Sequence, residues 1–155
     1  MEAFLAGIEQ LGFVRGLKAS FAAYPIVNAL HILSVGALLT SVGLMDFRIL
    51  GAFRTLPQAP FVTLLRRLAL AAFGGAVVTG ALLFSVRAAT YAAMPVFLAK
   101  MTLILLAGLN FLAFTRLARA NGGTEPAGGV AAVLAVISLG LWTCVLFAGR
   151  FIGFL

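Results

Sequence analysis

The chain has 155 residues, of which 63% are hydrophobic and only 10% are charged, and its formal net charge is +7. A soluble domain carries about a quarter charged residues, so this composition excludes an ordinary soluble domain and indicates a membrane protein. The basic residues lie between apolar runs and form no patch or stripe, so we expect the lipid bilayer as partner and no nucleic acid.

The first expected element is a short helix near the N-terminus. Apolar residues recur there at helical spacing, namely Phe4, Leu5, Ile8 and Leu11. Polar residues occupy the other faces, and Arg15 and Lys18 follow close behind. This pattern is typical of a helix that lies in the membrane interface.

Four apolar runs are long enough to cross a bilayer as helices, which takes about 20 residues each. They cover residues 24–45, 68–86, 95–115 and 127–149. Membrane barrels show ten-residue alternation instead, and that pattern is absent from this sequence. We therefore predict an all-α fold: an integral membrane four-helix bundle with a short N-terminal interfacial helix, forming a single transmembrane domain over residues 1–155.

The connections between the spans predict the orientation. The longest is expected over residues 46–67, and the Gly-rich and Pro-containing stretch 121–126 predicts a turn. One side carries six basic side chains, Arg48, Arg54, Arg66, Arg67, Arg116 and Arg119. The other side carries four, Arg15, Lys18, Arg87 and Arg150. By the positive-inside rule we expect a multi-pass protein of the bacterial inner (plasma) membrane with both termini in the periplasm.

His31 and Lys100 interrupt otherwise uncharged spans, and ionisable side chains in hydrocarbon mark candidate functional sites. Counted from the span ends at about 1.5 Å per residue, His31, Thr79, Lys100 and Trp142 lie at similar depth, roughly 7–12 Å from the non-cytoplasmic surface. Asn28 precedes His31 by three residues and shares its helix face. We predict that these five residues form a polar layer that binds a cofactor.

Three chemistries fit this layer. The sequence does not identify the cofactor, and haem b and copper are the candidates. His31 is the predicted metal ligand, because imidazole binds both haem iron and copper. A desolvated Lys100 suits a proton relay or a general base. A cationic Lys100 instead suits a porphyrin carboxylate or a lipid headgroup. Two structural interpretations are also open: His31 bridges helices by hydrogen bonding, and Lys100 extends its amine to the headgroups.

Other polar and small residues predict how the spans are held. Asp46 and Arg48 at the cytoplasmic end of the first span predict a structural ion pair that anchors it. Asn110, in the middle of the third span, requires an interhelical partner. Small residues at four-residue spacing in the second span predict close helix packing. They are Ala71, Gly75 and Thr79 on one face, and Ala72, Ala76 and Gly80 on another.

Several stretches resemble a family of small bacterial four-span membrane proteins, over nearly the whole chain. They are the runs 24–31 (YPIVNALH), 44–51 (LMDFRILG) and 97–100 (FLAK), and Thr79-Gly80 with Phe84. More distantly, the chain is similar to the membrane domain of CopD-type copper-resistance proteins and to HemJ-type protoporphyrinogen oxidases. This resemblance implies haem, porphyrin or copper handling. His31 matches the histidine of the first span, Arg48 an arginine near its end, and Lys100 the lysine of the third span.

The functional prediction therefore has two classes. The first is a membrane protein that binds haem, porphyrin or copper through the layer around His31 and Lys100; a quinone or lipid site in the same layer is a variant of it. The alternative is a non-catalytic accessory or interaction subunit, acting as a homo-oligomer or within a membrane complex. The sequence shows no nucleotide-binding Gly-rich loop, no Cys/His zinc spacing and no Ser-His-Asp set, and it leaves enzyme activity open.

Overall fold

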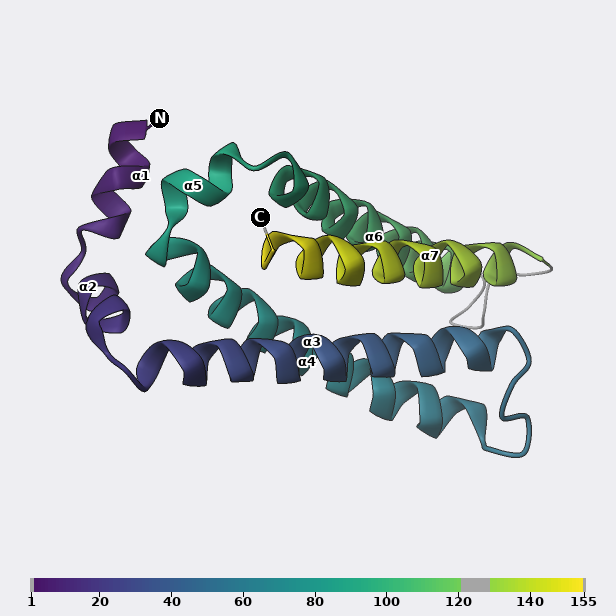
Figure 1. The fold of residues 1–155 in the computed structure, drawn as a ribbon. Coiled ribbons are helices and arrows are strands. Elements are labelled where there is room, and N and C mark those ends of the chain that lie inside the picture. The colour runs from purple at the N-terminus through teal and green to yellow at the C-terminus, as the bar shows by residue number, and fades with distance from the viewer. Residues whose placement is uncertain (1, 121–128, 155) are drawn as a thin grey trace. The chain divides into compact units, whose positions relative to one another are not determined.

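The computed structural model describes residues 2–120 and 129–154, and their regular structure is helical (Figure 1). In chain order the helices are α1 (Glu2–Glu9), α2 (Gly12–Ala19), α3 (Ala23–Ile49), α4 (Gln58–Val86), α5 (Ala88–Ala93), α6 (Pro95–Ala120) and α7 (Val130–Ile152). Of these, α3, α4, α6 and α7 are long and apolar enough to cross a membrane. The prediction of an all-α multi-pass membrane protein with four spans is therefore confirmed.

The long helices extend beyond the predicted spans. Helix α3 continues past Asp46 to Ile49 and α4 already begins at Gln58, so residues 50–57 replace the longer predicted connection. Pro60 is compatible with the early start of α4, because N–H groups in the first helical turn have no acceptor within the helix and proline lacks only that group. The predicted turn at 121–126 lies outside the described residues, as do the first two residues of the span predicted at 127–149.

Helix α3 ends in a glycine-capped motif. The Gly51 N–H donates to the Arg48 carbonyl at 3.2 Å, and the Ala52 N–H donates to the Phe47 carbonyl at 2.9 Å. These two bonds define a Schellman cap, and the φ of +99° at Gly51 is the left-handed conformation that such a cap requires. The chain thereby reverses direction between two spans.

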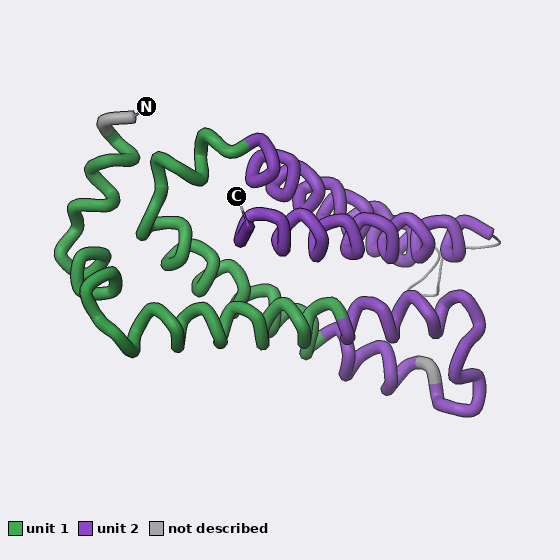
Figure 2. The backbone as a smooth tube through the Cα atoms, in the orientation of Figure 1, with its two compact units in different colours: residues 1–39, 67–94 green, residues 40–66, 95–155 purple. Residues whose placement is uncertain are grey.

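The chain divides into two compact units, and α3 and α4 each contribute residues to both (Figure 2). Unit 1 comprises residues 1–39 and 67–94. In it, α1 packs against α2 and α5, and the Glu9 carboxylate accepts a hydrogen bond from the Ala89 N–H at 3.0 Å. Two short helices thus stand where one interfacial helix was predicted. Helix α5 was not predicted, because a helix this short shows no periodic pattern of apolar residues.

Unit 2 comprises residues 40–66 and 95–155, with α6 packed on α7. Small buried residues, including Ala107 and Ala135, allow the close approach of these helices. The Asn110 amide donates to the Leu134 carbonyl of α7 at 3.0 Å. The predicted interhelical partner of Asn110 is therefore confirmed.

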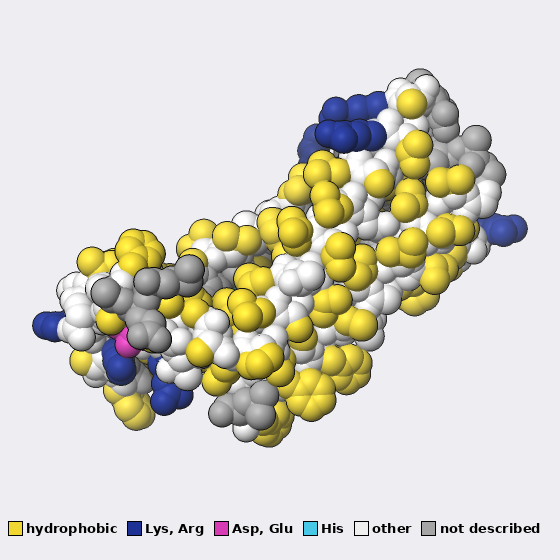
Figure 3. Space-filling model, turned by 90° about the horizontal axis from the view of Figure 1, so that it is seen from above, with side chains coloured by type: hydrophobic (Ala, Val, Ile, Leu, Met, Phe, Trp, Pro, Cys, Tyr) yellow, Lys and Arg dark blue, Asp and Glu magenta, His cyan; other side chains and the backbone are white. Residues whose placement is uncertain are grey.

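Large hydrophobic side chains are exposed along all four spans, and hydrophobic side chains cover much of the face shown in Figure 3. Examples are Leu33 (68% exposed), Val78 (62%), Leu105 (64%) and Phe147 (59%). Leaving such a side chain in water forgoes about 1.5–3 kcal/mol of burial. A lipid environment removes this cost and agrees with the membrane assignment.

Candidate functional site

His31 of α3 meets Thr79 of α4 within unit 1. The distance from His31 Nδ1 to Thr79 Oγ1 is 2.9 Å. Thr79 is buried and the imidazole is half-buried. Two residues predicted for the polar layer are therefore in direct contact.

The hydrogen bonds of Thr79 favour one tautomer of His31. The Thr79 hydroxyl donates its single hydrogen to the Gly75 carbonyl at 2.6 Å, as helical threonines often do toward the preceding turn. Its oxygen must then accept the proton that lies on His31 Nδ1. In the neutral imidazole this arrangement places the lone pair on Nε2.

Two glycines of α4 allow this approach. A Cβ atom at Gly80 would lie 3.1 Å from His31 Cε1, and one at Gly75 would lie 2.8 Å from Ser34 Oγ. Both distances are shorter than ordinary van der Waals contact. The close packing predicted from the small residues of the second span is confirmed at these two positions.

Aromatic side chains gather near the C-terminal end of α4, and the sequence did not predict their contact. The Phe84 and Tyr91 rings stack with centroids 6.4 Å apart, and the Tyr91 and Tyr24 hydroxyls are hydrogen bonded. Burial and the neighbouring Tyr24 raise the pKa of Tyr91, and the nearby Arg87 opposes this shift. Tyr91 lies on the unpredicted helix α5, so no sequence signal connected it to the first span.

The other predicted layer residues have separate environments. Asn28 is exposed on α3, one turn before His31. Lys100 and Trp142 belong to unit 2, where both are half-buried. The Lys100 side chain crosses α7 at Gly149, where a Cβ atom would lie 3.3 Å from Nζ. The structure thus brings His31 and Thr79 together, and it places Lys100 and Trp142 in the other unit.

Asp46 lies in a second polar cluster, at the far end of α3. Its side chain is only 6% exposed, and its carboxylate accepts a hydrogen bond from Ser138 of α7. Its Oδ2 atom has no hydrogen-bond partner among the described residues. The Arg48 guanidinium donates to the Leu56 carbonyl at 3.4 Å. The ion pair between Asp46 and Arg48 stays a prediction.

We expect the free energy of unfolding of Asp46→Asn to lie within about 1 kcal/mol of the native value or above it. The variant removes a buried charge, and this gain offsets the weaker hydrogen bond from Ser138. Asp46→Ala leaves the Ser138 hydroxyl unpartnered and is expected to cost about 1–3 kcal/mol. Thermal unfolding of both variants in the same detergent measures the difference. Equal losses in the two variants would show that the negative charge itself stabilises the fold.

Within residues 2–120 and 129–154, no three His, Cys, Asp or Glu side chains come together in a group that could hold a metal ion. No family model, curated protein or solved structure matches the chain. His31 and Thr79 provide one hydrogen-bonded imidazole between two apolar helices, and imidazole is a common metal ligand.

Proposed function

We propose that this protein binds haem or a related metalloporphyrin in a bacterial inner membrane, with both termini in the periplasm and with His31 as the axial ligand. The observation that carries the proposal is the relay from His31 Nδ1 through the Thr79 hydroxyl to the Gly75 carbonyl. Histidines that ligate metals commonly donate their other ring N–H to a carboxylate, a backbone carbonyl or water, which fixes the ring and its tautomer. The Thr79 hydroxyl takes that place here. The proposed ligand atom is Nε2.

The available donors fit haem better than copper. A porphyrin supplies four nitrogens, so one protein imidazole is sufficient to hold its iron. A copper site takes several protein ligands, usually histidine, cysteine or methionine. Among the described residues, no three His, Cys, Asp or Glu side chains lie close enough together to hold a metal ion. A bound haem would supply one-electron chemistry, while His31 and Thr79 orient it and the apolar helices exclude water.

Lys100 has an assisting role in the proposal, as a cation for a porphyrin carboxylate. Lys100 is half-buried, and the end of its side chain, from Cδ to Nζ, lies against α7 at Gly149. Because Lys100 belongs to unit 2, its role requires a test of its own. Lys100→Met is expected to weaken haem binding but to leave the position of the Soret band unchanged, since the axial ligand is retained.

The test is a visible spectrum with iron and copper analysis of protein purified from haem-replete membranes. We expect a Soret band and about one iron per chain, both lost in His31→Ala, because a single axial histidine holds the iron. Thr102→Val on α6 is the control and should retain both. Its hydroxyl is exposed and donates only to the Leu98 carbonyl of its own helix.

Three results would overturn this proposal. Colourless, metal-free native protein would favour the accessory-subunit alternative. Stoichiometric copper without a Soret band would favour the copper alternative. A Soret band that persists in His31→Ala would exclude this histidine as the ligand.

A further inference from the structure

The segment before the first span leads directly into the membrane. Helix α2 ends at Ala19 and α3 begins at Ala23. Between them, the Ser20 hydroxyl oxygen accepts a hydrogen bond from the Ala23 N–H at 3.1 Å and so caps the start of α3. Because only three residues separate α2 from a membrane-spanning helix, α2 must lie at the membrane surface.

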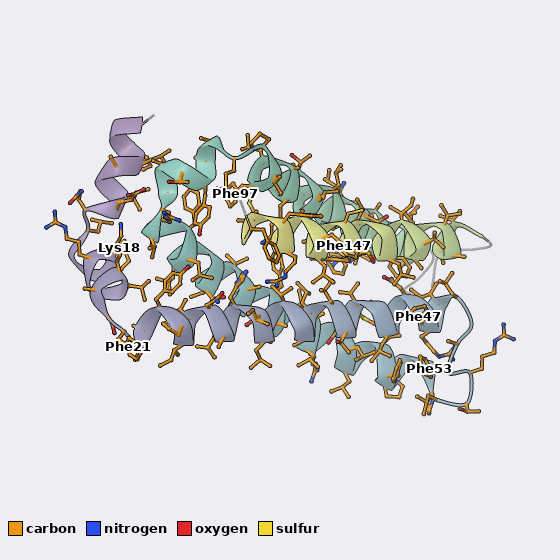
Figure 4. The ribbon with its side chains drawn as sticks, viewed as in Figure 1. Lys18, Phe21, Phe47, Phe53, Phe97 and Phe147 are labelled. Carbon is orange, nitrogen blue, oxygen red and sulfur yellow. The ribbon has the colours of Figure 1, made fainter. Side chains whose placement is uncertain are left out.

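Aromatic side chains on this segment are turned outward. Phe21 projects away from the ribbon between α2 and α3 (Figure 4). It is 98% exposed and Phe13 is 59% exposed, whereas Val14 is completely buried. Val14 therefore fixes α2 to the protein, and the two phenylalanines face the surroundings. Rings in such positions are stable where they can enter the boundary between headgroups and acyl chains.

The charges of this segment are all positive. Arg15 and Lys18 are exposed, and α2 contains no acidic residue. Glu9, on the preceding helix, accepts the hydrogen bond from Ala89 and so is directed toward α5. The Arg15 guanidinium donates to the side-chain oxygen of Gln10, which is neutral, so the segment keeps its positive charge. A surface that combines exposed aromatic rings with cations complements a membrane rich in anionic phospholipids.

We propose that residues 12–21 form a lipid-binding surface that selects anionic phospholipids, with Arg15 and Lys18 at the lipid phosphates and Phe13 and Phe21 in the acyl boundary. The partner is the bilayer itself, because the surface is continuous with the first span. This inference does not depend on haem binding. Each basic residue near an anionic surface contributes about a fivefold preference, so about 25-fold is expected from the pair.

The experiment uses the full chain in lipid nanodiscs, with tryptophan at position 21 (Phe21→Trp) in a Trp142→Phe background, since Trp142 is the single native tryptophan. Quenching by brominated phosphatidylglycerol is compared with quenching by brominated phosphatidylcholine. We expect half-quenching at a mole fraction of the anionic lipid that is about 25-fold lower. Arg15→Gln with Lys18→Gln should abolish this difference, and inorganic phosphate should not compete.

The matched control is Arg116→Gln with Arg119→Gln on α6, which removes the same charge at the same spacing. It should preserve the preference for phosphatidylglycerol. An unchanged preference in the Arg15/Lys18 variant, or an equal loss in the control, would overturn the inference. Absence of quenching by either lipid would show that protein covers this surface.

Discussion

Valine at Gly75 is expected to lower the free energy of unfolding by about 1–3 kcal/mol more than valine at Gly74, because only Gly75 lies against another helix. A Cβ atom at Gly75 would come within 2.8 Å of Ser34 Oγ, and the branched methyl groups of valine would extend further into α3. Rotation of the serine relieves the first contact but not the second. Unfolding of both variants in the same detergent measures the difference.

Gly74 is a close control because it is the adjacent residue on the same helix. A Cβ atom there meets nothing within 4 Å. The low helix propensity of valine affects both variants alike and cancels in the comparison. Equal stabilities would mean that the α3–α4 contact tolerates separation, and the placement of His31 beside Thr79 would then lose its support.

Thr79→Val is expected to weaken haem binding by about 10- to 100-fold, the range typical when the partner of a metal-ligating histidine is removed. Valine has nearly the shape of threonine but cannot accept the proton on His31 Nδ1. The imidazole then loses the bond that fixes its tautomer and ring orientation. Titration of the purified apoprotein with haem, followed at the Soret band, gives the affinity.

Thr143→Val is the control for this substitution. The Thr143 hydroxyl donates to the Leu139 carbonyl at 2.7 Å, the same bond to the preceding turn that Thr79 makes, but it is exposed on α7. Haem affinity should stay at the native value in this variant. If Thr79→Val binds haem as tightly as Thr143→Val does, Thr79 is not a positioning residue for His31.

The spans were predictable because few backbone structures can cross the hydrocarbon core of a bilayer. A chain in hydrocarbon must satisfy its own backbone hydrogen bonds, so long apolar runs without barrel alternation become helices. For the same reason, a polar side chain within a span was expected to hydrogen bond to another helix, and the Asn110 amide donates to the Leu134 carbonyl of α7. Short helices outside the spans escaped prediction, since α2 and α5 depend on contacts with their neighbours more than on a repeating pattern.

By itself, the sequence determined the number of spans and the small residues of α4 that allow a close neighbour. Both follow from the composition and spacing of residues along a helix, which need no knowledge of packing. Only the tertiary structure decided which residues meet: His31 with Thr79, and Asp46 with Ser138. The rotation of each helix and the choice of its neighbour are set by side-chain packing and interhelical hydrogen bonds, which distance along the chain does not encode.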